Sequence, residues 1–226
     1  MFGGSCFLCR GGADASRPDG LLCAACDADL PRISDGLCPR CGLETHGGAA
    51  CGRCLADPPP YDATFAALRY RFPADVLVHA LKFHGELALA PWLGRLLASR
   101  VGRAERIDRV LPVPLSAARL RTRGYNQAME LARPLAATLG AALDPRLCER
   151  TRDTPAQSDL PWAERARNVR AAFRCSRPLD GAAVAVVDDV MTTGATLAEI
   201  ARTLKQAGAS RVVNCVVART FPPAEA

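Results

Sequence analysis

Residues 184–196 read Val-Ala-Val-Val-Asp-Asp-Val-Met-Thr-Thr-Gly-Ala-Thr, and this stretch decides the fold. It begins inside a continuous apolar run over 182–187 that is rich in valine. A run of this kind, without alternating polar residues, predicts a strand buried on both faces, as in a parallel sheet covered by helices. Two aspartates and a short turn follow, and then a segment over 196–207 with helical spacing that Gly208 closes. The stretch therefore predicts a strand–turn–helix unit of an α/β domain.

The remainder of the chain continues this alternation of strands and helices. Apolar runs predict strands over 64–70, 109–113 and 212–217, and apolar spacing predicts helices over 74–83, 87–100 and 126–139, the last kinked at Pro134. This order is typical of a parallel sheet flanked by helices in a doubly wound α/β domain. Between Leu147 and Phe173 the pattern fails. A polar, arginine-rich segment of this length predicts a functional loop or a surface excursion.

The aspartates and the turn have the chemistry of a sugar-phosphate site. Ionised carboxylates accept hydrogen bonds from sugar hydroxyls, and ligand crevices open at the carboxyl ends of parallel strands. The turn presents backbone N–H groups and the positive end of a helix dipole to a phosphate, and its glycine allows close approach. We predict a phosphorylated-ribose site with Asp188 and Asp189 as catalytic residues. The substrate-binding residues expected beside them are Val190, Met191, Thr192, Thr193, Gly194, Ala195 and Thr196.

Eight of the eleven cysteines lie in the first 54 residues, as four C-x-x-C pairs. Two residues between thiolates let one turn aim both sulfurs at one ion, and two such turns complete a tetrahedral shell suited to structural zinc. We predict two zinc ions, the first pair of cysteines sharing an ion with the second and the third with the fourth. A crossed arrangement, disulfides and an iron–sulfur cluster are the alternatives. The predicted ligands are Cys6, Cys9, Cys23, Cys26, Cys38, Cys41, Cys51 and Cys54.

Three consecutive prolines, 58–60, follow the cysteine-rich part. Because prolines interrupt regular elements, we predict a double zinc-ribbon module over 1–57 and a larger α/β domain over 58–226. The N-terminus has no charged segment followed by an apolar stretch, and no apolar run reaches the length of a membrane helix. We therefore expect a cytoplasmic protein without membrane insertion.

The net charge of +6 is unevenly distributed. Residues 1–60 carry five arginines and seven acidic residues, so the positive charge lies in the remainder, and Lys82 and Lys205 are the only lysines. Guanidinium groups suit phosphate oxygens, so the positive charge indicates either an anionic ligand or nucleic acid, or a solvated basic surface. Aromatic residues are only 5% of the chain, which weakens the case for a base-stacking platform. Those near the basic stretches are Tyr70, Tyr125 and Trp162.

The stretch over 184–196 resembles the signature of the type I phosphoribosyltransferases. In that family, the paired acids hold the ribose 2′ and 3′ hydroxyls and the following loop holds the 5′-phosphate. Three further segments, together with the double zinc ribbon, resemble one branch, the ComF (ComFC/GntX-like) family. They are LKFHGE at 81–86, LPVPLSAARLRTRGYNQA at 111–128 and RTRDTPAQSDLPWAERARNVRAAF at 150–173.

The resemblance implies a ligand, phosphoribosyl pyrophosphate with Mg²⁺, and assigns segments to it. A loop over 114–119 would bind the pyrophosphate, with Arg119, Arg121 and Arg123 supplying positive charge. The segment 150–168 would close over the site, and its polar residues of interest are Thr154, Gln157, Arg165 and Asn168.

The ComF family is associated with natural transformation, the uptake of single-stranded DNA, together with a helicase-like partner. The resemblance thus implies a competence protein that binds phosphoribosyl pyrophosphate. The sequence contains no recognisable pocket for an acceptor. Two alternatives therefore stay open: a true phosphoribosyltransferase with an unidentified acceptor, and a single-stranded-DNA-binding protein that uses the fold without catalysis.

Overall fold

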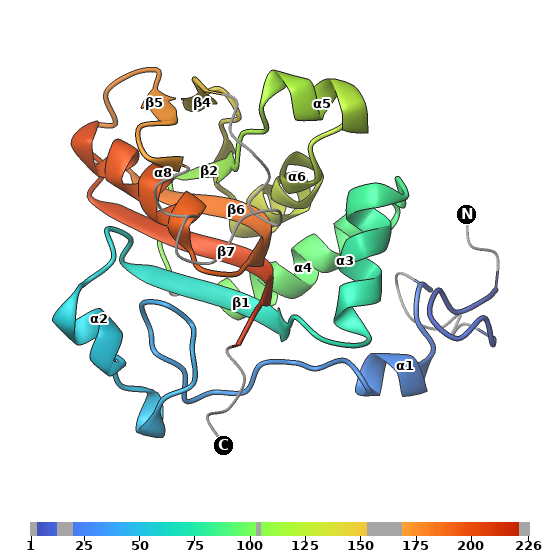
Figure 1. Cartoon of the computed structure of the whole chain (residues 1–226). Helices are drawn as coiled ribbons and strands as arrows, with labels where there is room; N and C mark the ends of the chain where they lie inside the picture. The colour runs from blue at the N-terminus through green and yellow to red at the C-terminus, as the bar shows by residue number, and fades with distance from the viewer. Residues whose placement is uncertain (1–3, 13–19, 103–104, 153–168, 222–226) are drawn as a thin grey trace.

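The computed structural model describes residues 4–12, 20–102, 105–152 and 169–221, and its centre is a five-stranded parallel sheet (Figure 1). The strand order is β1-β7-β6-β2-β3, and every neighbouring pair is parallel. These strands are β1 (Ala63–Arg69), β2 (Arg109–Pro112), β3 (Ala142–Leu143), β6 (Ala183–Met191) and β7 (Arg211–Arg219). The predicted α/β fold class is confirmed.

Helices cover both faces of this sheet. Helices α4 (Leu89–Val101) and α6 (Gln127–Leu139) pack on one face, and α8 (Ala195–Gln206) packs on the other. Successive side chains of a strand point to opposite faces. Val187 therefore joins the apolar cluster of α4 and α6, while Val186 joins that of α8. The valine-rich run is buried on both sides, as its composition predicted.

Several shorter elements complete the fold. The antiparallel pair β4 and β5 was not predicted, and neither was helix α5, which begins at the capping residue Ser116 and ends at the left-handed Gly124. Pro134 lies inside α6, which continues to Leu139, and a Cβ atom on Gly94 of α4 would lie 2.3 Å from its ring. The remaining elements are α1 (Ala24–Ala28), a 3₁₀ turn (His46–Gly48), α2 (Gly52–Ala56), α3 (Ala74–Phe83), α5 (Ala117–Arg123), β4 (Cys148–Arg150) and β5 (Phe173–Cys175).

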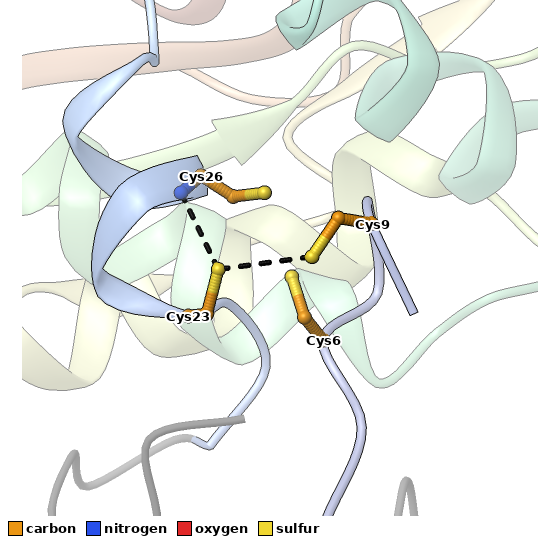
Figure 2. A group of neighbouring side chains, drawn as sticks. All are labelled: Cys6, Cys9, Cys23 and Cys26. Carbon is orange, nitrogen blue, oxygen red and sulfur yellow. Dashed lines mark hydrogen bonds between the residues drawn. The ribbon is translucent and has the colours of Figure 1, made fainter. Parts of the chain in front are cut away.

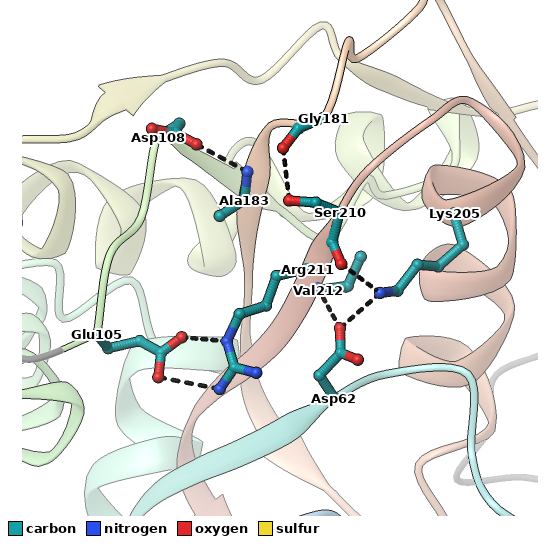
Figure 3. Close-up of polar contacts among 9 residues, drawn as sticks. All are labelled: Asp62, Glu105, Asp108, Gly181, Ala183, Lys205, Ser210, Arg211 and Val212. Atoms are coloured by element: carbon teal, nitrogen blue, oxygen red, sulfur yellow. Dashed lines mark hydrogen bonds and ion pairs between the residues drawn. The ribbon is translucent and has the colours of Figure 1, made fainter.

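The amino ends of the parallel strands are fastened by side chains (Figure 3). The carboxylate of Asp62 accepts a hydrogen bond of 2.7 Å from the backbone N–H of Val212, and that of Asp108 accepts one of 2.8 Å from Ala183. Lys205 forms an ion pair of 2.7 Å with Asp62. The two hydrogen bonds connect β1 with β7 and β2 with β6 at the amino ends of the strands.

The cysteine-rich segment lies along the β1 edge of the sheet (Figure 1). Arg32 forms an antiparallel bridge with Leu68, and the N–H of Ile33 donates to the carbonyl of Ala67 at 3.1 Å. An uncovered edge strand exposes unpaired backbone groups and invites association with other chains. The segment between the two halves of the cysteine-rich part therefore protects the edge of β1.

Candidate functional site

A cavity of about 660 Å³ opens at the carboxyl ends of β6 and β2. This volume is within the range of small-ligand sites. Residues 188–197 line it without interruption, so the predicted sugar-phosphate residues are brought together. The other lining residues are Tyr70, His79, Lys82, Phe83, Val113, Leu115, Arg119, Arg123, Gln127 and Arg150.

Asp188 and Asp189 lie within β6, whereas the sequence predicted a strand that ends at Val187. The strand continues to Met191 because β7 remains paired with it there. Neighbouring residues of a strand point in opposite directions, so the two carboxylates differ in environment. Asp189 is only 3% exposed, whereas Asp188 is half-buried. The carboxylate of Asp188 accepts a hydrogen bond of 2.9 Å from the backbone N–H of Asp189.

Lys82, at the end of α3, forms an ion pair with Asp189, with 3.0 Å between Nζ and Oδ2. Burial acts to raise the pKa of Asp189, but the Lys82 ammonium together with the hydrogen bonds to Asp188, Lys82 and Gln127 outweighs this effect and holds that pKa below its ordinary value. Burial, and then the neighbouring Asp189 carboxylate, raise the pKa of Asp188 well above its ordinary value. One carboxylate is thus fixed in its ionised form by a cation, while its neighbour gains from any further donor or cation that enters the cavity.

A second side chain missed by the sequence analysis, Gln127 of α6, also contacts Asp189. Its amide nitrogen lies 3.5 Å from Oδ1, and its amide oxygen accepts a hydrogen bond from Arg123. Lys82 and Gln127 are remote from Asp189 in sequence, which explains why no local spacing indicated them. Asp189 is therefore the centre of a polar network built from α3, α5, α6 and β6.

The turn over 192–194 connects β6 to α8, which begins at Ala195, one residue earlier than predicted. Gly194 has a φ of +81°, a left-handed conformation that favours glycine. A Cβ atom on this residue would also lie 2.6 Å from the Met191 methyl carbon and 3.2 Å from the Tyr61 hydroxyl. The hydroxyl of Thr193 accepts a hydrogen bond of 3.1 Å from the N–H of Ala195. The turn is therefore closely packed against Met191 and Tyr61, and its residues line the cavity.

The resemblance assigned residues 114–119 to a loop, but residues from Ala117 onward form helix α5. Helical geometry places Arg119 and Arg123 one turn apart on the same side, and both line the cavity. Arg121 lies between them in sequence, is exposed, and is not among the lining residues. Because this segment is helical, Arg119 and Arg123 line the cavity and Arg121 does not.

The segment predicted to close over the site falls largely outside the described residues. Thr154, Gln157, Arg165, Asn168 and the aromatic Trp162 all lie there. Its two ends are described, and β4 pairs with β5, with Arg150 opposite Phe173. Since Arg150 also lines the cavity, the segment begins beside the site at this end.

The eight N-terminal cysteines form two groups of four, in the pairing that their spacing predicted. We call Cys6, Cys9, Cys23 and Cys26 the first cysteine site (Figure 2) and Cys38, Cys41, Cys51 and Cys54 the second cysteine site. Within each group all sulfur atoms lie within 4.8 Å of one another, and all eleven cysteines of the chain are described and unbonded. The crossed arrangement and the disulfide alternative are therefore not found.

One cysteine in each site, Cys6 in the first and Cys38 in the second, favours the thiolate form. Burial acts to raise the thiol pKa in each, but backbone N–H groups outweigh it and lower the pKa of Cys6 to about 6 and that of Cys38 to about 7. Thiolate is the form that binds a metal ion, and four thiolates at this spacing are a structural zinc shell. Both sites fit zinc.

Comparison with known protein families gives two matches, a double zinc ribbon domain over residues 1–55 and a phosphoribosyl transferase domain over 101–222. The relatives include the DNA utilization protein YhgH of Salmonella typhi, 40% identical over 225 residues, which cover 96% of this chain and 98% of that protein. Competence protein F of Haemophilus influenzae is 31% identical over 222 residues, covering 94% and 95% of the two chains. This chain belongs to the ComF family. The ComF-family relative from Streptococcus pneumoniae, competence protein ComFC, is 28% identical over 196 residues, covering 86% of each chain.

In this ComF-family protein, the Lys82–Asp189 ion pair makes a testable contribution to stability. Because the folded-state pKa of Asp189 is lowered, its contribution is present above the ordinary aspartate pKa and is lost as the pH falls through the lowered value. We expect Lys82→Met to reduce the free energy of unfolding at pH 7 by about 1–3 kcal/mol, since it leaves a buried carboxylate without its hydrogen-bonding partner. The difference from wild type should shrink in acid.

Denaturant titrations of both proteins at several pH values measure this difference, and loss of metal in acid affects both alike. The matched control is Lys205→Met, because Lys205 is as exposed as Lys82, at 30%, but pairs with the more exposed Asp62. We expect a loss below about 1 kcal/mol for the control. Equal losses for the two variants, or a Lys82 effect that is independent of pH, would contradict this account of the ion pair.

Proposed function

We propose that this protein binds phosphoribosyl pyrophosphate together with Mg²⁺ in the β6–α8 cavity and acts in DNA uptake during natural transformation. The observation that carries the proposal is the continuous lining of one cavity by residues 188–197. It combines two carboxylates suited to ribose hydroxyls with a glycine turn at the start of a helix suited to the 5′-phosphate. The names of its relatives, a DNA utilization protein and two competence proteins, support the biological role.

The remaining groups of the cavity suit the pyrophosphate. Arg119 and Arg123 present guanidinium groups from one side of α5, and Lys82 adds an ammonium group beside Asp189. Guanidinium groups bind phosphate oxygens through paired donors. Mg²⁺ prefers carboxylate and phosphate oxygens, so Asp188 and Asp189 are the residues of this cavity that would hold it, directly or through ribose and water. When bound, the ion would neutralise charge on the pyrophosphate.

Such a site also supports phosphoribosyl transfer as an alternative to binding alone. The bond between ribose C1 and the pyrophosphate oxygen would break, and its electron pair would leave with the pyrophosphate. A nucleophilic acceptor would then form the new bond to C1. Arg119 and Arg123 would stabilise the developing negative charge of the leaving group.

Two measurements test the proposal and separate binding from catalysis. Calorimetric titration with phosphoribosyl pyrophosphate should show saturable binding that weakens when Mg²⁺ is omitted. Incubation with Mg²⁺, phosphoribosyl pyrophosphate and candidate acceptors, with pyrophosphate release as the readout, identifies an enzyme if one acceptor accelerates release. Absence of binding at millimolar ligand would defeat the proposal.

A specific observation favours single-stranded DNA as a second ligand. The ring of Phe83 lines the cavity and is 57% exposed, with the Lys82 ammonium 5.7 Å and the Arg123 guanidinium 5.4 Å from its centroid. An exposed ring near two cations can stack a base of a strand whose phosphates contact the cations. The sequence pointed instead to three other aromatic residues near the basic stretches, Tyr70, Tyr125 and Trp162. Of these, Tyr70 lines the cavity, whereas the hydroxyl of Tyr125 donates to the Leu81 carbonyl.

We expect Phe83→Ala to weaken binding of an oligothymidylate by about 5- to 100-fold, the range for loss of one stacked base. The matched control is Phe72→Ala, which removes a still more exposed ring (76%) that does not line the cavity. Fluorescence anisotropy at several salt concentrations gives both affinities and the steep salt dependence expected of phosphate contacts. Equal effects of the two variants, or no complex at low salt, would reject this ligand.

We also propose that the protein is located in the cytoplasm. In the part of the chain that the structure describes, no helix is long and apolar enough to cross a membrane. Thiolate sites for zinc require reduced cysteines, which favours the cytoplasm. There the protein would meet internalised single-stranded DNA and a helicase-like partner.

A further inference from the structure

Arg219, the last residue of β7, is a charged side chain that is only 1% exposed. Its guanidinium donates to four backbone carbonyls. Nε donates to Cys41 at 3.0 Å, and Nη1 donates to Met191 at 2.9 Å, to Thr220 at 2.8 Å and to Thr192. A buried charge is tolerated only when it is extensively hydrogen-bonded or paired. Arg219 meets this condition by joining three separate segments of the chain.

Two of these segments have functions assigned above. Cys41 belongs to the second cysteine site. Met191 is the last residue of β6, and Thr192 begins the turn over 192–194, which we call the phosphate turn because the proposed function places the 5′-phosphate there. The planar guanidinium has donors that point in different directions, so one side chain can bond both segments at once. The cysteine site and the floor of the cavity are therefore connected through a single buried group.

Tyr61 connects the same two regions by packing. Tyr61 is buried, and its hydroxyl oxygen would lie 3.2 Å from a Cβ atom placed on Gly194. Burial, and next the nearby Cys41 thiolate, raise the pKa of Tyr61. The knuckle of the second cysteine site is the turn from Cys38 to Gly42. A Cβ atom on Gly42 would lie 3.3 Å from a methyl group of Thr64 on β1. The knuckle of the second cysteine site is thus closely packed against the sheet and the turn.

We propose that Arg219 is a positioning residue through which zinc at the second cysteine site fixes the phosphate turn, so that zinc binding and phosphate binding are coupled. The inference rests on the proposed function for its phosphate ligand. A zinc ion with four thiolates carries a net charge of −2, which stabilises the guanidinium beside it. Without zinc the Cys41 knuckle loses its constraint, and Arg219 loses a fixed acceptor on that side. Coupling between two sites is reciprocal, so phosphate ligands should also strengthen zinc retention.

The first cysteine site provides an internal contrast. It packs with Phe7 and Leu22 into the apolar cluster that contains α3 and α4, away from the Arg219 carbonyl contacts. Loss of zinc there should therefore leave the turn unchanged. The proposal thus distinguishes two cysteine sites of the same composition by their position in the fold.

Hydrogen–deuterium exchange over residues 190–197 tests the coupling without requiring any ligand. Three variants are compared with wild type: Arg219→Lys, Cys51→Ser in the second cysteine site and Cys9→Ser in the first. Arg211→Lys, at the other end of β7, is the matched control for the arginine change. Zinc content is measured for each protein, and exchange over 183–187 of β6 reports any general loosening.

We expect Arg219→Lys to retain both zinc ions and to raise exchange of the turn about tenfold or more, because charge-assisted hydrogen bonds are lost. Cys51→Ser should lose one zinc ion and have the same effect. Cys9→Ser and Arg211→Lys should leave the turn as in wild type. Affinity for ribose 5-phosphate should fall in parallel with the rise in exchange.

Wild-type exchange at the turn in both Arg219→Lys and Cys51→Ser would overturn the proposal, and so would equal effects of Cys9→Ser and Cys51→Ser. A rise over 183–187 as large as that over 190–197 would also overturn it, because it would indicate a merely structural role. If exchange changes as expected but wild type does not bind ribose 5-phosphate, the connection stands and the proposed ligand is wrong. The two failures are therefore distinguishable.

Discussion

Replacing Asp188 and Asp189 together by asparagine is expected to weaken Mg²⁺-dependent binding of phosphoribosyl pyrophosphate by about 100-fold or more. Each ionised carboxylate would accept charge-assisted hydrogen bonds from ribose hydroxyls, and such bonds contribute about 1.5–3 kcal/mol each. An amide retains one acceptor but loses the charge that attracts both hydroxyls and Mg²⁺. Calorimetric titration of wild type and variant, after thermal melting has shown that both are folded, measures the ratio.

The matched control for this experiment is Asp180→Asn. Asp180 is exposed and has a φ of +49°, a conformation that asparagine also adopts readily. The affinity of the Asp180→Asn variant for phosphoribosyl pyrophosphate should equal that of wild type. The single variants Asp188→Asn and Asp189→Asn measure the contribution of each acid separately, since of the two only Asp189 forms an ion pair with Lys82. Binding by the double variant within about threefold of wild type, less than one charged hydrogen bond provides, would refute the role of these residues.

Removal of zinc should have the largest effect on stability. Metal analysis of protein purified under reducing conditions should give about two zinc ions per chain, the number of Cys₄ sites. A strong chelator should then lower the melting temperature by about 10 °C or more, because structural zinc contributes far more than the few kcal/mol needed for such a shift. The effect should spread beyond the cysteine-rich part, because residues 31–33 cover the β1 edge and Arg219 donates hydrogen bonds to both Cys41 and Met191.

Differential scanning fluorimetry with and without chelator measures this shift, and readdition of zinc should restore the original melting temperature. A chelator-treated chain without metal that melts at the same temperature as the untreated protein would contradict a structural role for zinc. So would untreated protein that contains no zinc.

The fold was largely predictable because its local signals agree with its global arrangement. The valine-rich run of β6 has no polar alternation, and the sheet indeed buries both of its faces. The cysteine spacing likewise specified both the ligands and their grouping. The module boundary at residue 57 stays a prediction.

Element ends and short elements were less predictable, because pairing and capping decide them. β6 extends past Val187 only because β7 is there to pair with Asp188, Val190 and Met191. A polar residue such as Asp188 resembles the end of a strand when the partner strand is unknown. Helix α5 depends on its Ser116 cap and on Gly124, which local apolar spacing does not register.

The candidate site was predictable where it is continuous in sequence and was missed where it is assembled by the fold. Residues 188–196 line the cavity as one segment, whereas Lys82 and Gln127 reach Asp189 from other helices. Arg219 was one arginine among many until the structure placed its guanidinium between four carbonyls. No spacing rule distinguishes such a residue, since its role depends on its burial and on carbonyl partners that the fold brings together.

The most direct test of the central claim is a crystal structure of the zinc-loaded protein with phosphoribosyl pyrophosphate and Mg²⁺, in which the position of the 5′-phosphate is measured. The account predicts the phosphate on the backbone N–H groups of residues 192–196 and the ribose hydroxyls on Asp188 and Asp189. The pyrophosphate should lie toward Lys82, Arg119 and Arg123. A ligand bound elsewhere, with the turn over 192–196 unoccupied at saturating concentration, would contradict it.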